Sequence, residues 1–255
     1  FLMTTLPKNK KITLYNLGET LMEVTENIRT LSVDIGGSGV KLMVLDKSGN
    51  PLTEKLRVET PQPASRKLVI DAILELAKMA GEFERISVGF PGVVQNGVTN
   101  TAVNLDSDWV GFDLATALFE FLKKPVKVVN DADMQGLAAI AGEGVELVVT
   151  LGTGFGSALF VNGKLVPNLE MGHHRFRKGD TYEEQLGRTA LKKVGDEKWN
   201  KRLKKAIDSL QSLFNYDYLY IGGGEAKKID IELPSNVKVI PNIFGLLGGI
   251  ALWQD

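Results

Sequence analysis

Residues 31–45 read Leu-Ser-Val-Asp-Ile-Gly-Gly-Ser-Gly-Val-Lys-Leu-Met-Val-Leu, and residues 147–161 read Leu-Val-Val-Thr-Leu-Gly-Thr-Gly-Phe-Gly-Ser-Ala-Leu-Phe-Val. The two stretches share one pattern: an apolar run, a turn rich in glycine with Ser or Thr, and a second apolar run. A polar turn follows each of them, at 47–50 and 162–164. Apolar runs bounded by turn residues predict buried strands. The repetition therefore predicts two similar hairpins, which could hold a phosphate chain from both sides of a cleft.

The composition narrows the classes of protein that this chain can belong to. It has 255 residues, 44% of them hydrophobic, which is enough for one large domain or two lobes. A net charge of −1 argues against nucleic acid or an anionic membrane as the main partner. The absence of cysteine excludes disulfides, thiol catalysis and cysteine-ligated zinc. The sequence contains no apolar run long enough to predict a membrane span. The N-terminal residues do not resemble a secretory signal. We therefore expect a cytoplasmic protein.

Further strands and helices are expected around the two repeats. A short amphipathic helix is plausible near residues 14–24. The βββ–αβα order occurs twice, which predicts an α/β fold with two lobes around a cleft, where strand ends face the ligand. We expect an N-terminal extension (1–28), a small N-terminal lobe (29–130 with 243–255) and a larger C-terminal lobe (131–242). The expected strands lie within 30–59, at 85–90 and 126–129, within 145–167, and at 216–221 and 237–240; the expected helices lie at 68–80, 112–123, 134–141, 181–193, 198–214 and 245–253.

The glycine-rich turns of the two repeats are candidate phosphate-binding loops, as is a third glycine cluster later in the chain. Glycine lets backbone N–H groups approach a ligand closely, and successive N–H groups form anion-binding concavities. Ordinary hairpin turns also favour glycine, but two such turns in equivalent positions favour ligand binding. None of them is a Walker loop. The candidates are Gly36, Gly37, Ser38 and Gly39 in the first turn, Gly152, Thr153, Gly154 and Gly156 in the second, and Gly222, Gly223 and Gly224 in the cluster.

Two aspartates are expected where strands end. Asp131 would face the crevice, where its carboxylate could accept a proton from an attacking alcohol. The alternative is a helix N-cap, although Asp133 suits that role better. Asp34 precedes the first glycine turn and is well placed to hold Mg²⁺, directly or through water, against phosphates. Its alternative is a turn-capping role.

Two further segments carry polar groups of the kind that sugar hydroxyls need. Glu170 and His173 flank a glycine on the loop after the second repeat and offer both an acceptor and a donor. Asn104 and Asp106 lie close in sequence to Trp109. Taken alone, the segment with Glu170 and His173 would more often be a solvated polar loop, and the pattern around Asn104 and Asp106 is a weak signal.

Four segments together resemble the ROK family of sugar kinases and, more narrowly, its polyphosphate glucokinase branch. They are Asp-Ile-Gly-Gly-Ser-Gly-Val-Lys (34–41), Val-Val-Asn-Asp-Ala-Asp (128–133), Leu-Gly-Thr-Gly-Phe-Gly-Ser-Ala-Leu-Phe (151–160) and Leu-Val-Pro-Asn-Leu-Glu-Met-Gly-His (165–173). Asn-Leu-Asp-Ser-Asp-Trp (104–109) and Ile-Gly-Gly-Gly-Glu-Ala-Lys-Lys (221–228) fit that branch too. The resemblance covers about residues 30–254, in the family's order and spacing.

The resemblance implies an actin-like, ribonuclease-H-like fold of duplicated βββαβα lobes around a central cleft. It implies a phosphotransferase that phosphorylates the 6-hydroxyl of glucose with Mg²⁺, and a homodimer through the C-terminal lobe. Asp131 becomes the general base. The implied sugar contacts are Asn104, Asp106, Asn130, Asp131, Glu170 and His173; the implied donor contacts are Asp34 (with Mg²⁺), Lys41 and the three glycine groups, the third of which would flank a nucleotide.

The chain departs from the family pattern in three respects. The family's cysteine-rich zinc motif is missing, so structural zinc is not expected. Ser38 and Gly39 stand where ATP-dependent members usually continue Gly-Gly with Thr, which favours polyphosphate as donor over ATP. Glu225 places a carboxylate beside the expected adenosine region, which argues against strong nucleotide binding.

Several alternatives remain open on the sequence. One is an ATP-dependent kinase for glucose, mannose or another hexose; another is a sugar-responsive ROK repressor, although only about 28 residues precede the resemblance. A third is a non-catalytic actin-like assembly protein.

Polyphosphate, a long polyanion, would also need a track of basic residues that leads to the cleft, although basic residues on helices are more often just solvated surface. The candidates are Lys41, Arg175, Arg177, Lys178, Lys192, Lys193, Lys201, Arg202, Lys204 and Lys205.

Overall fold

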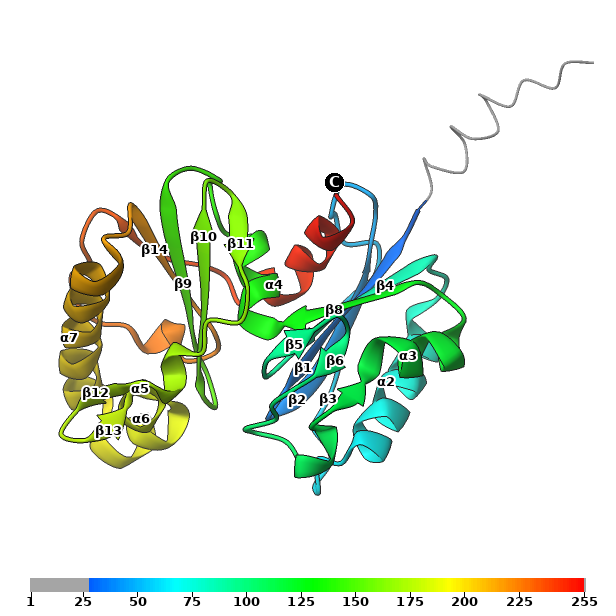
Figure 1. Ribbon diagram of the computed structural model, residues 1–255, viewed down its shortest axis with the longest axis horizontal. Coiled ribbons are helices and arrows are strands. Elements are labelled where there is room, and N and C mark those ends of the chain that lie inside the picture. The colour runs from blue at the N-terminus through cyan, green and yellow to red at the C-terminus, as the bar shows by residue number, and fades with distance from the viewer. Residues whose placement is uncertain (1–27, 255) are drawn as a thin grey trace, which may run out of the picture.

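The computed structural model describes residues 28–254, which form two α/β lobes side by side (Figure 1). The amphipathic helix expected near residues 14–24 lies outside the described residues. Each lobe is built on a five-stranded sheet, in the order β3-β2-β1-β4-β8 in the first lobe and β11-β10-β9-β14-β15 in the second. The two orders correspond strand by strand, so the predicted duplication is confirmed.

The first lobe places its apolar strand residues against two helices. Leu31, Val33 and Ile35 of β1 are fully buried, in one cluster with Val69 and Ile73 of α2. Strands β1, β2 and β3 are antiparallel neighbours, whereas β4 and β8 run parallel to β1. The elements of this lobe are β1 (Thr30–Gly36), β2 (Gly39–Leu45), β3 (Leu56–Val58), α2 (Arg66–Ala80), β4 (Arg85–Phe90), β5 (Val94–Gln95), β6 (Val98–Thr99), the 3₁₀ turn η1 (Ser107–Trp109), β7 (Phe112–Asp113), α3 (Leu114–Leu122) and β8 (Val126–Asn130).

The second lobe repeats this arrangement and adds a helical layer that includes α7. Trp199 and Leu203 of α7 are buried against Leu147 and Ile221 of the sheet. The capping box of Thr181 and Glu184 starts α5. The elements of the lobe are β9 (Val145–Leu151), β10 (Phe155–Val161), β11 (Lys164–Val166), η2 (Met171–His173), β12 (Arg175–Arg177), β13 (Asp180–Thr181), α5 (Tyr182–Leu186), α6 (Arg188–Val194), α7 (Asp196–Phe214), β14 (Tyr218–Gly222), η3 (Ala226–Lys228) and β15 (Val237–Val239).

A closing helical segment, α8 (Phe244–Leu247) followed by η4 (Gly248–Trp253), returns to the first lobe. It lies between the lobes in Figure 1, drawn in red. Ser32 and Ser87, on the face of the first sheet opposite the apolar cluster, donate hydrogen bonds to the carbonyls of Leu246 (2.5 Å) and Gly249 (2.6 Å). Buried serines therefore satisfy the backbone of the closing segment and attach it to the first sheet.

The short helix α4 (Asp131–Leu137) lies at the centre of the molecule, between the two sheets and the closing segment (Figure 1). A Cβ atom at Gly248 would lie 1.6 Å from the carbonyl oxygen of Met134, and one at Gly136 would lie 2.5 Å from the Phe160 ring. Gly89 of β4 likewise makes room for Asp131. These glycines let α4 pack against both lobes more closely than residues with a Cβ atom would allow.

Several predicted boundaries were wrong. The helix expected at 134–141 begins earlier, at Asp131, because Asn130 caps it: its side-chain oxygen accepts hydrogen bonds from the N–H groups of Ala132 (2.8 Å) and Asp133 (3.2 Å). Asp133, the expected cap, is buried in the first turn. Phe112 and Asp113 pair with β6 instead of opening a helix, and Gly187 divides the stretch expected at 181–193 into α5 and α6. The smaller sheets β5–β6–β7 and β12–β13 were not predicted.

Within residues 28–254, no helix is both long enough and apolar enough to cross a membrane.

The Gly248 contact gives a direct test of this packing. Gly248→Ala should lower the free energy of unfolding by about 3 kcal/mol, because the added methyl group would overlap the Met134 carbonyl and force α4 away from the closing segment. Gly152→Ala is the matched control, since no heavy atom lies within 4 Å of its Cβ position; it should cost about 0.5 kcal/mol or less. Chemical denaturation measures both, and equal losses would contradict the packing argument.

Candidate functional site

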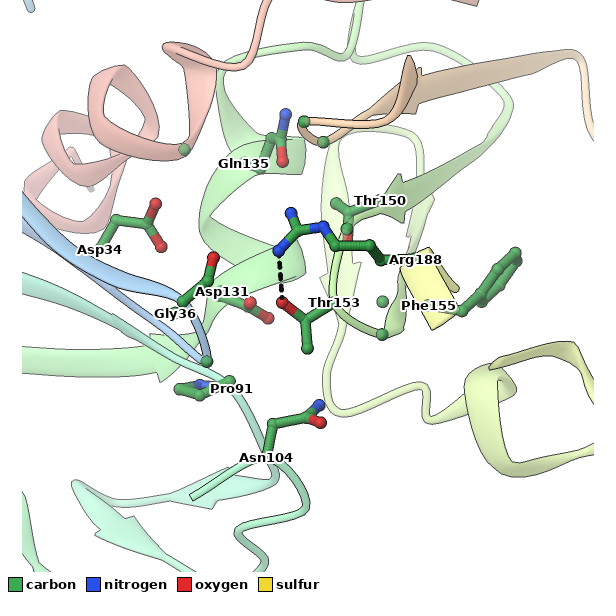
Figure 2. A pocket seen from close by; sticks show the side chains of 18 of the residues that line it. Asp34, Gly36, Pro91, Asn104, Asp131, Gln135, Thr150, Thr153, Phe155 and Arg188 are labelled. Carbon is green, nitrogen blue, oxygen red and sulfur yellow. Dashed lines mark hydrogen bonds between the residues drawn. The ribbon is translucent and has the colours of Figure 1, made fainter. Parts of the chain in front are cut away.

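A cavity of about 470 Å³ lies between the lobes and is lined by residues of both. Figure 2 shows Asp34, Asp131 and Arg188 directed into it from different elements. Most of the residues predicted from sequence line this one cavity. They are Asp34, Gly36, Gly37, Ser38, Gly39, Lys41, Asn104, Asn130, Asp131, Gly152, Thr153, Gly154, Gly156, Glu170, His173, Gly223 and Gly224.

The two glycine turns, one from each lobe, approach each other across the cavity. A Cβ atom at Gly37 would lie 3.6 Å from Cγ2 of Thr153 and 3.1 Å from Cβ of Asn104. One at Gly154 would lie 3.2 Å from Nδ2 of Asn104. Asn104 therefore lies between the turns, and a side chain at either glycine would crowd it.

Asp131 is half-buried, at the start of α4. One of its oxygens accepts a hydrogen bond from the N–H of Ala132 at 2.8 Å. Burial, and then the negative charges of Asp34, Glu170 and Asp133, raise the pKa of Asp131 to about 8. Its carboxyl group is therefore poised to gain or lose a proton near neutral pH.

Asn130 connects the start of α4 with the predicted sugar loop. Besides capping the helix, it donates hydrogen bonds from Nδ2 to the Gly92 carbonyl (3.1 Å) and to Oε1 of Glu170 (3.2 Å). Oε2 of Glu170 lies 3.5 Å from Nε2 of His173. Burial raises the pKa of Glu170. Asn130 thus fixes the Glu170 carboxylate, and Glu170 in turn lies beside His173.

Asp34 forms an ion pair with Lys41, its direct neighbour across the β1–β2 ladder, with 2.6 Å between Oδ2 and Nζ. Both side chains are largely buried, 14% and 22% exposed. The pair points into the same cavity as Asp131, so one cation and two carboxylates lie close to the first glycine turn.

Among residues 28–254, two buried polar groups beside the cavity lack a hydrogen-bond partner. Oδ1 of Asp133 has none, and burial, together with the negative charge of Glu170, raises the pKa of Asp133 to about 7. Nε2 of Gln135 also has none; Gln135 lines the cavity and packs against Gly222. Such orphaned groups are uncommon in folded proteins.

Two predicted residues and most of the predicted basic track lie away from the cavity. Asp106 precedes the η1 turn, and Gly222 lies behind Gln135. Of the basic candidates only Lys41 lines the cavity. Several of the others have partners elsewhere: Lys201 pairs with Glu197, and Arg202 donates to the Gln185 carbonyl.

The sequence did not reveal several charged residues that line the cavity: Arg57, Glu183, Arg188 and Lys227. Glu183 accepts a hydrogen bond from the N–H of Phe155 at 3.2 Å. Arg57 donates to the Ser38 carbonyl at 3.0 Å. Arg188 pairs with Glu225, with 2.6 Å between Nε and Oε1. Arg57, Glu183 and Arg188 lie outside the segments singled out in the sequence, so only the fold brings them to the site, whereas Lys227 follows the third glycine cluster closely.

Comparison with known proteins extends these observations. The model of the ROK family matches residues 30–187. Polyphosphate glucokinase of Mycobacterium tuberculosis (strain CDC 1551 / Oshkosh) is 32% identical over 234 residues, covering 85% of this chain and 88% of the relative. The crystal structure of the inorganic polyphosphate/ATP-glucomannokinase from Arthrobacter sp. strain KM superposes with a TM-score of 0.81 at 34% identity, covering 89% of this chain and 100% of that one.

A more distant structure, a ROK family glucokinase from Streptomyces griseus in complex with glucose and AMPPNP, has a TM-score of 0.71 at 20% identity, covering 88% of this chain and 98% of that one. At this identity the likeness concerns the fold alone. The actin-like, ribonuclease-H-like fold expected from the sequence is confirmed.

The raised pKa of Asp131 predicts a pH-dependent stability difference. Because the folded state holds this proton more tightly than the unfolded state, the carboxyl contributes stability below about pH 4 that is lost as pH rises to about 8. Asp131→Asn carries no charge, so its stability relative to the wild type should grow between pH 5 and pH 8, by at most about 1.4 kcal/mol per pH unit. Urea denaturation measures it, with the exposed Asp71→Asn as control. A difference that does not change with pH would refute the assignment.

Proposed function

The chain belongs to the ROK family, and we propose that it phosphorylates the 6-hydroxyl of glucose with inorganic polyphosphate as the phosphoryl donor. The observation that carries the proposal is Asp131, a half-buried carboxylate with a raised pKa that lines one cavity together with two glycine turns and a group of sugar-type ligands. A general base for an alcohol acceptor and a polyanion site are thereby combined in one cleft.

The charges of the cavity divide it into a sugar side and a phosphate side. Glu170 and Glu183 are carboxylates, which would repel phosphate but accept hydrogen bonds from hydroxyl groups. His173, close to Glu170, supplies a group that can donate. We therefore assign this side to glucose, with Asn104 and Asn130 as further contacts. Asp106 lies off the cavity and is the least supported of the sugar contacts.

The phosphate side is formed by the glycine turns. Their backbone N–H groups can approach the donor because no Cβ intervenes. As the 6-oxygen of glucose attacks the terminal phosphorus, Asp131 accepts the hydroxyl proton; the bond from that phosphorus to the bridging oxygen breaks, and the shortened chain leaves. Such a transfer asks the protein mainly for positioning and charge stabilisation.

The carboxylates on the phosphate side fit Mg²⁺, which binds one or two carboxylates together with substrate phosphates and water. Asp34 would hold it, directly or through water, and the ion would neutralise charge on the donor phosphates. Among residues 28–254 no cluster of three or more acidic or histidine side chains that could hold a metal ion is found. Lys41, already paired with Asp34, would remain beside the donor.

Closure of the two lobes over glucose would exclude water, which would otherwise compete as acceptor. We take the closing bodies to be residues 29–130 with 243–255, and residues 131–242. A cytoplasmic location and a homodimer formed through the C-terminal lobe belong to the same proposal.

The second candidate is an ATP-dependent hexose kinase, favoured by the glycines at 223 and 224, which line the cavity where a nucleotide would lie.

The donor is tested by initial rates of glucose 6-phosphate formation with polyphosphate or ATP, each with Mg²⁺. We expect a higher kcat/KM with polyphosphate, and loss of turnover when the metal is chelated. Turnover with ATP alone would establish the second candidate instead.

The base is tested by Asp131→Asn. The variant should lose activity by about 10²- to 10⁴-fold, because the attacking hydroxyl keeps its proton. Glucose binding, measured by calorimetry, should persist. In the wild type, kcat/KM should rise about tenfold per pH unit up to about pH 8, since the base must be deprotonated. An active variant or a flat pH profile would show that another group is the base.

The sugar side is tested by Glu183→Ala. Loss of a charged hydrogen-bond acceptor should raise the KM for glucose about tenfold while the KM for the donor stays unchanged. Glu120→Gln, an exposed carboxylate on α3, is the control. A raised donor KM with normal glucose KM would place Glu183 on the phosphate side.

A further inference from the structure

Arg188 lies where the second glycine turn meets the third glycine cluster. Its backbone N–H donates to the Gly152 carbonyl at 2.9 Å. Nη1 lies 3.4 Å from Oγ1 of Thr153, the contact drawn in Figure 2. A Cβ atom at Gly224 would lie 3.9 Å from Nη2. The guanidinium group therefore connects two segments that the sequence analysis assigned to the phosphoryl donor.

Glu225 fixes the orientation of this guanidinium group. Its Oε1 accepts from Nε of Arg188 at 2.6 Å, and its side chain is only 13% exposed. The pair uses the Nε edge of the arginine and leaves the Nη groups facing the cavity. Among residues 28–254, Thr153 supplies the one further side-chain acceptor within hydrogen-bond distance, and that contact is long.

Arg188 differs from the other cations of the cavity in being both oriented and available. Lys41 is engaged by Asp34, and Arg57 is exposed and directed to the Ser38 carbonyl. Lys227 is exposed. The Arg188 side chain is 32% exposed and held by a buried partner. A planar guanidinium whose Nη groups make only one long contact, to Thr153, matches the paired oxygens of a phosphate, and a preoriented one loses less freedom when it binds.

We propose that Arg188, oriented by Glu225, binds the segment of the polyphosphate chain that follows the transferred phosphoryl group. This inference rests on the proposed function and names a donor-binding residue for it. Glu225, which the sequence analysis took as a carboxylate unfavourable to a nucleotide, is in this proposal the positioning residue of the arginine that binds polyphosphate.

The test is the dissociation constant of inorganic tripolyphosphate, measured by calorimetry with Mg²⁺ and without glucose. Arg188→Met should raise it at least fivefold, because charge-assisted hydrogen bonds are lost. Arg188→Lys keeps the charge but not the planar fork and should raise it at least twofold. Lys205→Met, which removes an exposed cation of α7, should change it less than twofold.

A double variant separates this effect from misfolding and from net charge. Arg188→Met leaves Glu225 unpaired, which can destabilise the fold. Arg188→Met combined with Glu225→Gln removes both charges, so that no unpaired ion remains and the net charge is unchanged. It should still raise the tripolyphosphate dissociation constant at least fivefold while the affinity for glucose stays within twofold of the wild type.

A smaller rise in the double variant, or an equal loss of glucose affinity, would overturn the role of Arg188. The donor proposal fails separately: a wild-type protein that makes no glucose 6-phosphate from polyphosphate would overturn it, whatever the binding constants are.

Discussion

Helix α4 packs at backbone distance against both sheets and the closing segment, and this close packing fixes where the groups of the cleft lie. Gly248 meets the Met134 carbonyl on one side and Gly136 meets the Phe160 ring on the other. Asp131, the first residue of α4, is thereby held at the boundary between the two lobes. Because α4 contacts both lobes, a movement of one lobe relative to the other would change the packing around this short helix.

The position of Asp131 at the start of α4 also places its carboxyl group close to three other carboxyl groups. Asp131 lies near Asp34, Glu170 and Asp133, and each of these carboxyl groups is at least partly shielded from water. Burial, and to a lesser degree the neighbouring negative charges, makes ionisation costly and raises the pKa values of Asp131 and Asp133. A bound metal cation or a captured proton relieves this cost. With a pKa of about 8, Asp131 favours its protonated form at neutral pH, and a cation beside it would favour the ionised form that a general base needs.

The sequence predicted the parts of the structure that depend on local patterns. The repeated apolar runs and glycine turns define both hairpins, and β4 was predicted at its observed bounds. The cap of α4 was missed because Asn130, Asp131 and Asp133 are all good caps, and only the backbone geometry selects Asn130. The strands β5, β6 and β7 are too short to give a periodic signal. Arg188 and Glu225 stand 37 positions apart, so their pairing depends on the fold.

The glycine turns also bear on how such a site can change through evolution. In the role proposed for the glycine turns, phosphate binding by backbone N–H groups would depend little on the neighbouring side chains, whereas side chains added at Gly37 or Gly154 would crowd the cavity. Changes of donor would then arise more readily through the side chains around the turns than through the turns themselves. The residues proposed for the base and for the sugar could be inherited intact through such a change.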